Sequence, residues 1–219
     1  NEIKSQLWDS FVLGSCLMKK FLTISLISLI FALNAHSENY SYGSLGLTKH
    51  VAEDPHDSTG STYFKDPDDK GLVISYGFGN RSGNLALETE FSYYGEVSQK
   101  LTSDVSVDVT TFSIMENIMY TSEFGSNRYI LAGLGLGWGR TNVDTNYNAS
   151  GDTLNKDNDN TTFGHQIILG YGMENYEIVF KHSDFGEVKG GSGTTSGSNA
   201  YAADEFDSVY KSISLRYKF

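Results

Sequence analysis

The chain has 219 residues, a formal net charge of −11 and a mean hydropathy of −0.31. The acidic charge argues against nucleic acid as a partner, because phosphate binding needs a basic surface, and the modest hydropathy argues against a helical membrane protein. The single cysteine, Cys16, leaves the rest of the chain without the residue needed for disulfides, thiol catalysis or Cys-ligated metal sites.

The first 37 residues have the features of processing sequence rather than of a folded domain. Residues 1–17 precede Met18 and are expected to be a non-native or untranslated upstream extension. Residues 18–37 have the basic start, short apolar run and small residues of a cleavable signal peptide. An uncleaved anchor is the alternative, but the apolar run is shorter than the about 20 residues that a spanning helix needs. We therefore expect the mature chain to begin at Glu38.

Residues 38–219 are predicted to form one domain of eight β-strands, because side chains alternate and Gly, Asn, Asp and Ser cluster between the alternating stretches. The predicted strands are 40–50, 70–79, 85–95, 106–120, 128–140, 161–173, 176–184 and 207–219. Long polar connections are predicted at 51–69, 96–105, 141–160 and 185–206, and short ones at 80–84, 121–127 and 174–175. This alternation predicts an all-β, antiparallel, up-and-down transmembrane barrel with short periplasmic turns and long extracellular loops.

Individual strands have the two faces of a barrel wall. In 85–95 the apolar parity is predicted to face lipid, which turns Glu88 and Glu90 towards the lumen. In 128–140 the glycines at 133–139 oppose an apolar face that ends in Trp138, which we expect in the outer aromatic girdle. The strand 106–120 is ambiguous, since its apolar parity also exposes Glu116. An acid facing lipid at mid-depth is unfavourable, so we expect a bulge or the opposite parity there.

The last strand ends on an aromatic residue, and its apolar face carries Ile213, Leu215, Tyr217 and Phe219. It resembles the C-terminal strand of bacterial outer-membrane barrels, whose final aromatic belongs to the signal for membrane insertion. The resemblance implies that Leu215, Tyr217 and Phe219 form the insertion signal and that the barrel-assembly machinery is a partner during insertion.

Four stretches, taken with their order and spacing, resemble the OmpA-like superfamily of eight-stranded outer-membrane barrels, which includes the OmpX, Opa and Omp25-type surface proteins. They are 115–120, 129–138, 177–186 and 213–219, and they are similar to the family's N-x-x-Y, Y-x-x-x-G-x-G-x-G and Y-R-Y-x-D-F-G stretches and its terminal strand. The resemblance implies a monomer in the outer membrane of a Gram-negative bacterium, in contact with lipid and lipopolysaccharide. Members of a common architecture have scattered functions, so the family alone does not give the function.

An eight-stranded barrel has an interior only wide enough for side chains to fill. Buried charges need partners, so we expect a plug of ion pairs among the candidate lumen residues. These are Glu88, Glu90, Glu116, Glu177, Lys181 and Arg216, with Lys218 as a further lumen cation. A narrow, porin-like ion path through the same charges is the alternative.

The predicted external loops are acidic and offer a second kind of site. Carboxylates at 50–70 and 142–162 suit divalent cations that bridge to anionic lipopolysaccharide. The stretch 157–160 is similar to a calcium loop but lacks its central glycine and terminal glutamate. The Gly- and Ser-rich stretch 190–199 is predicted to be a mobile loop. A host or surface ligand that binds through these loops is possible, and a solvated surface without a ligand is the alternative.

An enzymatic role is disfavoured. Residues 180–184 are similar to the His-x-Ser-Asn stretch of lipid A deacylases, but His182 and Ser183 are adjacent and are predicted to point to opposite faces. A metal site of His50, His165 and His182 lacks a recognisable ligand spacing. We therefore expect no catalytic residue, cofactor or metal, and a structural or surface-interaction role in membrane integrity or adhesion. The alternatives are a narrow channel, a lipid A-modifying enzyme and, less consistently with the loop pattern, a soluble secreted β-sandwich.

Overall fold

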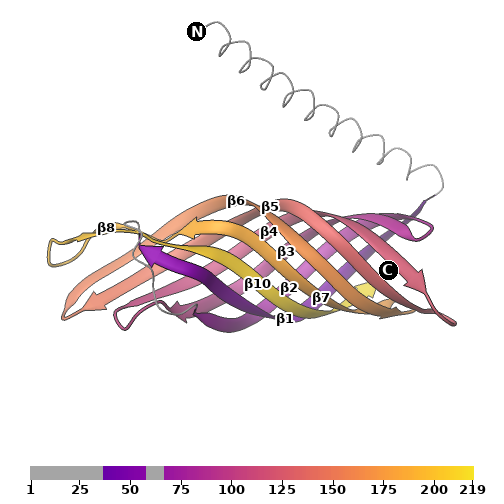
Figure 1. The fold of residues 1–219 in the computed structure, drawn as a ribbon, viewed down its shortest axis with the longest axis horizontal. Coiled ribbons are helices and arrows are strands. Elements are labelled where there is room, and N and C mark those ends of the chain that lie inside the picture. The colour runs from indigo at the N-terminus through magenta and orange to yellow at the C-terminus, as the bar shows by residue number, and fades with distance from the viewer. Residues whose placement is uncertain (1–36, 58–66) are drawn as a thin grey trace, which may run out of the picture.

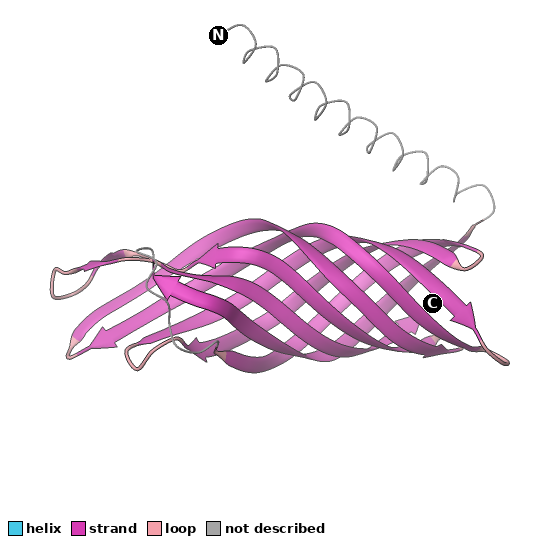
Figure 2. Ribbon diagram, viewed as in Figure 1, coloured by secondary structure: helices cyan, strands magenta, loops and turns pink. Residues whose placement is uncertain are grey.

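The computed structural model describes residues 37–57 and 67–219, which form one closed antiparallel barrel (Figures 1 and 2). Its long strands are β1 (Glu38–Asp57), β2 (Asp68–Ser82), β3 (Leu85–Lys100), β4 (Val105–Glu123), β5 (Arg128–Ala149), β6 (Asp152–Met173), β7 (Tyr176–Lys189) and β10 (Asp204–Lys218). The predicted eight-stranded up-and-down barrel is confirmed. The predicted upstream extension and nearly all of the predicted signal peptide lie outside the described residues. Within the described residues, no helix is long and apolar enough to cross a membrane.

Each long strand pairs with its neighbour in the sequence, and β10 closes the barrel against β1. The short-turn end of the barrel carries the turns at 83–84, 124–127 and 174–175, and the hairpin end carries the other connections. Figure 1 shows the C-terminus at the short-turn end and the small β8 hairpin beyond the opposite end. The two ends therefore differ as expected for a barrel that projects from one side of a membrane.

The strands are staggered around the barrel. The direct partners run Lys70, Lys49, Lys211, His182, Ile167, Leu134, Ile118, Leu87 and Asn80, and so return to β2 ten residues further along. Ten residues of about 3.3 Å against eight strand spacings of about 4.8 Å correspond to a tilt of about 40°. Directly paired residues consequently lie at different depths along the barrel axis.

The outer face of the wall has a continuous apolar belt. Its members on β3 and β5 have the predicted parity, which confirms those assignments. Trp138 is 61% exposed and packs edge-to-face on Phe163, with ring centroids 5.7 Å apart. At the short-turn end Tyr217 lies 5.1 Å from Tyr176 and 6.3 Å from Phe219, again between ring centroids. Aromatic rings thus border the belt at both ends, as in barrels that sit in lipid.

The long polar loops predicted at 96–105 and 141–160 are wrong. β3 continues to Lys100, and β5 and β6 form a long hairpin whose turn lies at 150–151. Beyond the apolar belt the outward side chains are mostly polar or charged, so the sequence there has the composition of a loop. The inward positions still alternate, and Val107, Val109 and Val143 are fully buried. Strands that face water on one side keep this pattern without an apolar outer face.

The predicted loop 185–206 also contains structure. β7 ends at Lys189, and the strands β8 (Gly193–Thr194) and β9 (Ala200–Tyr201) form a small separate hairpin. Asp152, at the start of β6, anchors it by accepting hydrogen bonds from Thr195 Oγ1 at 2.8 Å and from the Gly197 amide at 2.6 Å. The glycine-rich stretch is therefore a docked hairpin rather than a structureless loop.

The interior is filled in layers, whose order can be followed along β7. Glu177 and Lys181 lie in a charged layer towards the short-turn end, Phe185 lies in an aromatic layer, and Val188 belongs to an apolar core at the hairpin end. The aromatic layer also contains Tyr94 and Tyr210, whose ring centroids are 4.2 Å apart. The barrel thus has a packed core that extends beyond the apolar belt.

Candidate functional site

The charged layer of the lumen is built from strands that are far apart in the sequence. Glu88 and Glu90 come from β3, Glu177 and Lys181 from β7, and Arg216 and Lys218 from β10. Their strands are regular at these positions, so strict alternation turns each side chain inward while its neighbours in the chain face lipid. Three carboxylates and three cations share the layer.

The ion pairs cross the barrel. Lys181 Nζ lies 2.8 Å from Glu90 Oε1. Arg216 contacts all three carboxylates, with its guanidinium nitrogens 3.2 Å from Glu88, 3.3 Å from Glu90 and 3.3 Å from Glu177. Lys218 makes a further ion pair with Glu177. Each carboxylate therefore has at least one cation partner, as buried charges require.

Tyrosines complete the hydrogen bonding of the carboxylates. Tyr40 Oη donates to Glu88 at 2.7 Å and Tyr129 Oη donates to Glu177 at 2.8 Å. Tyr42 Oη lies 3.1 Å from Glu90, and the ring of Tyr42 packs under the Arg216 guanidinium at 3.8 Å. The sequence analysis did not single out these tyrosines. The alternation of side chains along β1 and β5 places these tyrosines on the inner face, so the sequence pattern was sufficient to identify them.

Five of the six charged residues of the layer are buried, and Lys218, at its edge, is partly exposed. Glu90 is 0%, Arg216 1%, Glu177 1%, Glu88 2% and Lys181 4% exposed. Side chains that line a water-filled channel are wetted, whereas these are covered by protein on every side. The arrangement can neutralise and cross-link the interior.

Glu116 does not join the lumen cluster, and the expectation of a bulge or opposite parity at this position is wrong. β4 is regular around Glu116, which pairs with Thr89 on β3 and Leu136 on β5. Its side chain points outward from the barrel and accepts a hydrogen bond from Thr89 Oγ1 at 2.8 Å. A single cross-strand hydrogen bond accommodates the acid without breaking the ladder.

Four basic side chains form a row on the outward face of the barrel. They occupy directly paired positions on β2, β1, β10 and β7, namely Lys70, Lys49, Lys211 and His182. The ammonium groups of Lys70, Lys49 and Lys211 are like charges on directly paired positions, which repel. Acids offset part of this charge, with Lys49 Nζ 2.8 Å from Asp68 and Lys211 Nζ 3.5 Å from Glu53.

A largely apolar groove of about 600 Å³ adjoins this basic row on the outer surface. Its aliphatic and aromatic wall includes Leu47, Ile167, Leu169, Phe180 and Ile213. Cationic heads beside an apolar groove match the chemistry of an amphiphile that has an anionic head and acyl chains.

The histidines do not converge on one site. His50 is buried in the lumen, where its ring nitrogens lie 2.8 Å from Gln99 Nε2 and 3.0 Å from Ser208 Oγ. His165 and His182 face outward instead. Ser183 is buried on the lumen side of β7, so His182 and Ser183 lie on opposite faces of the strand. The structure therefore brings no Ser–His pair together at this position.

The outer surface of the β5–β6 hairpin is acidic. Asp108, Asp144 and Asp157 occupy directly paired positions on β4, β5 and β6. Partial burial and the neighbouring carboxylates of Asp157 and Asp108 raise the pKa of Asp144. Close to them, Arg140 Nη2 pairs with Asp159 at 2.7 Å, which lowers the pKa of Asp159. The predicted acidic loop is thus the outer face of paired strands.

Comparison with known proteins identifies the fold only. No family model matches the chain, and no curated protein matches its sequence. Among solved structures, Neisserial surface protein A (NspA) is similar at 18% identity, with a TM-score of 0.50 over 84% of this chain and 99% of the other. The attachment invasion locus protein Ail of Yersinia pestis, in complex with the heparin analogue sucrose octasulfate, has 11% identity and a TM-score of 0.47 over 83% and 99%.

The outer membrane protease OmpT from Escherichia coli is also similar, at 9% identity and a TM-score of 0.45 over 84% of this chain and 96% of OmpT. At 18% identity the likeness to NspA shows the fold and not the activity. The chain therefore has the closed antiparallel barrel fold of the bacterial outer-membrane proteins.

Proposed function

We propose that the chain is a non-enzymatic outer-membrane barrel whose lumen is plugged by ion pairs and whose role is structural or surface-interacting. The burial of the charged layer supports this most directly, since none of Glu88, Glu90, Glu177, Lys181 and Arg216 is more than 4% exposed. A closed interior cannot exchange solutes without rearrangement, so the outer wall and the hairpin end are left as the working surfaces.

The hairpin end supports a role in contact with the surroundings. The β5–β6 hairpin carries ordered polar and acidic side chains well beyond the apolar belt, over a packed interior. A rigid surface loses little conformational entropy on binding. We infer that this surface meets ions, other surfaces or other cells, as adhesion requires.

The outer wall supports a role in the membrane itself. The basic row and its adjoining groove are complementary to phosphorylated lipids with acyl chains, which is the chemistry of lipopolysaccharide. We infer that the barrel is a monomer and that lipid and lipopolysaccharide are its partners. We also infer that the barrel-assembly machinery inserts the chain and recognises Leu215, Tyr217 and Phe219.

A narrow ion channel is the second candidate, because six charged groups of both signs cross the lumen. Single-channel recording of the full chain in planar bilayers distinguishes the two. The plug predicts no conductance steps in the wild type. Steps that disappear in Lys181→Met, in a variant that still shows heat-dependent electrophoretic mobility, would contradict the plug and establish the channel.

A further inference from the structure

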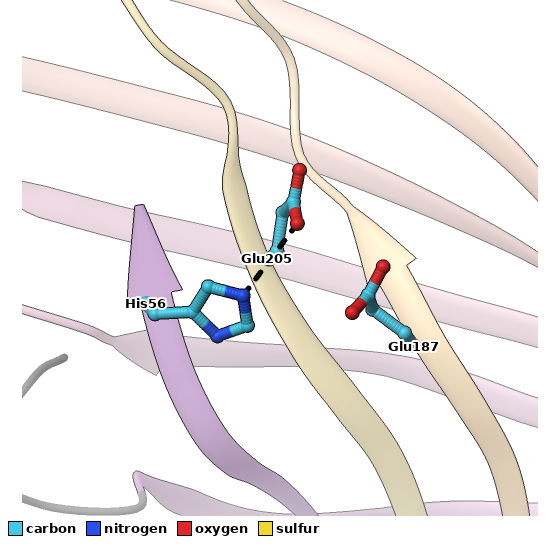
Figure 3. Close-up of side chains that lie close together, drawn as sticks. All are labelled: His56, Glu187 and Glu205. Atoms are coloured by element: carbon cyan, nitrogen blue, oxygen red, sulfur yellow. Dashed lines mark ion pairs between the residues drawn. The ribbon is translucent and has the colours of Figure 1, made fainter. Parts of the chain in front are cut away.

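Three side chains that bind divalent metal ions well converge on the outer surface at the hairpin end. His56 on β1, Glu205 on β10 and Glu187 on β7 each present one ligand atom, and these atoms lie within 4.8 Å of one another. The strands are neighbours, with β10 between β1 and β7. Figure 3 shows the imidazole of His56 on β1 turned towards Glu205 on β10. Glu187 comes from β7, the neighbour of β10 on its other edge.

Two β-bulges place these side chains on one face. β1 has one extra residue between Glu53 and His56, and β7 has one extra residue between Asp184 and Glu187, each relative to β10. An extra residue turns every later side chain of a strand to the opposite face. Without the bulges, His56 and Glu187 would point into the apolar core instead of outward beside Glu205.

The ring of His56 is oriented as a ligand. Its Nδ1 lies 2.8 Å from the backbone oxygen of Asp54, so Nδ1 carries the hydrogen and donates it. In the neutral imidazole the lone pair is then on Nε2, which faces Glu205 Oε2 at 3.5 Å. A backbone carbonyl that holds one ring nitrogen while the other is free to coordinate is the usual support of a metal-bound histidine.

The distances suit a small ion after a modest closure. Ligand atoms around tetrahedral zinc, at about 2.0–2.1 Å from the ion, lie about 3.3 Å apart. His56 and Glu205 are already close to this separation, and Glu187 is an exposed side chain that can move. Nitrogen and carboxylate ligands together suit borderline ions of the zinc class, whereas calcium prefers oxygen alone.

A lysine occupies the carboxylates in this structure. Lys189 Nζ lies 2.7 Å from Glu205 Oε1 and 3.9 Å from Glu187 Oε1, and its side chain is half exposed. Other acids crowd the same surface, since Asp207 on β10 is directly paired with Glu187 on β7 and with Glu53 on β1. One ammonium group thus offsets several carboxylates, and a divalent ion would offset more of the repulsion.

We propose that His56, Glu187 and Glu205 bind a divalent transition-metal ion of the zinc class, with water as a fourth ligand and with Lys189 displaced from Glu205. The bound ion joins β1 to β10 and β7, across the seam where the first and last strands meet. This site does not depend on the proposed function, because a plugged barrel or a channel would carry it equally.

The test is calorimetric titration of Zn²⁺ into the full chain, purified in detergent without a histidine tag and freed of metal by chelation. We expect saturable binding by the wild type, and His56→Gln should weaken it at least about tenfold, since even second-shell changes cost that much. His165→Gln is the matched control, because His165 is also an outward-facing histidine but lies on β6. Every variant must retain heat-dependent electrophoretic mobility, which reports a folded barrel.

Lys189→Met separates a metal site from a purely structural ion-pair cluster. Removal of the competing ammonium should tighten Zn²⁺ binding about two- to fivefold, the range of an exposed ion pair. Unchanged or weaker binding in Lys189→Met would overturn the proposal. So would wild-type binding that His56→Gln leaves intact, or Ca²⁺ binding as tight as that of Zn²⁺.

Discussion

Arg216 is the residue on which the charged layer depends. Its guanidinium contacts three carboxylates and stacks over Tyr42 while only 1% of the residue is exposed. A planar group with five donors in a fixed fork can serve several acceptors at once, which an ammonium cannot do as well. Removal of Arg216 would leave three buried carboxylates with only two lysines.

Arg216→Met is therefore expected to destabilise the barrel by about 3–5 kcal/mol, because it leaves buried charge uncompensated. The measurement is the free energy of unfolding in urea, for protein reconstituted in lipid vesicles. Lys100→Met, at an exposed position at the end of β3, is the control and should change little. Equal stability of the two variants would show that the carboxylates find water or are protonated.

Glu116 leads to a prediction of opposite sign. It faces outward in the apolar belt, and Thr89 donates its one cross-strand hydrogen bond. Glu116→Leu should raise the free energy of unfolding in the same vesicles by about 1 kcal/mol or more, since an acid on the lipid face is unfavourable at mid-depth. Thr89→Val, which removes only the hydrogen bond, should lower stability. A lower free energy of unfolding in Glu116→Leu would contradict this prediction and would mean that the contacts of Glu116 on the outer wall stabilise the barrel.

The alternation of side chains predicted which face of a strand most residues occupy, but it did not predict where a strand bulges. Alternation in the sequence was sufficient to predict that Glu88, Glu90, Glu177, Lys181 and Arg216 share the inner face. It could not predict the side of Glu116, because the cost of exposing one acid competes with the cost of breaking a regular ladder. It also could not find His56, whose position depends on a bulge that no local pattern indicates.

Among the elements, β5 shows how side-chain crowding selects residues. Its inward glycines lie against β4 and β6, and a Cβ built on Gly135 would meet the side chains of Asn117 and Gln166. Glycine at these positions therefore relieves crowding between side chains on the inner face of the wall. Residues other than glycine would force the strand or its neighbours apart.

Gly135→Ala should consequently lower the free energy of unfolding by about 1–3 kcal/mol, the usual range for overpacking a filled interior. Gly43→Ala on β1 is the matched control, because a Cβ there meets nothing within 4 Å. The comparison uses urea unfolding of both variants in vesicles. If both alanines had the same effect, strand propensity rather than crowding would explain the glycines.

The β8–β9 hairpin is held by the ionised side chain of Asp152 as well as by backbone contacts between Ser196 and Thr153. Hydrogen bonds from Thr195, Asn199 and the Gly197 amide lower the pKa of Asp152 to about 2. Because the pKa in the folded state is below the usual value of about 3.9, the anchoring is complete above about pH 4 and is lost as the pH falls through 2. Nuclear magnetic resonance of the Gly197 amide should show a transition near pH 2.

Asp152→Asn should remove this transition and expose the segment 190–199 to limited proteolysis at neutral pH. Asp104→Asn, in the turn between β3 and β4, is the control and should leave the Gly197 signal unchanged. A transition that persists in Asp152→Asn would assign the titration to another group.

The number, order and faces of the strands were predictable, because lipid contact imposes a long apolar period-two signal. Their outer ends were not, since strands that leave the membrane face water and lose that signal on one side. The hairpin of β5 and β6 shows this, with buried Val143 and Leu154 among many Asn and Asp residues. Polar composition alone was mistaken for irregular loop.

On the scale of the whole molecule, the stagger links register to membrane depth. A row of directly paired residues climbs around the barrel at an angle, so Lys70 at the end of the apolar belt and His182 within it belong to one row. Lipid contacts along this row therefore sample both head groups and acyl chains. This geometry follows from the ten-residue stagger and could not be derived from any single strand.

The charged layer has a consequence for assembly. Two of its three cations, Arg216 and Lys218, arrive with β10, whereas Glu88 and Glu90 belong to β3, and 128 residues separate Arg216 from Glu88. Without β10, the charged layer holds three carboxylates and one paired cation, Lys181. The addition of β10 brings the two cations that balance the layer. The last strand of the chain is thus the one that compensates carboxylates contributed by β3, near the start of the barrel, and a barrel that lacked it would bury acids without enough partners.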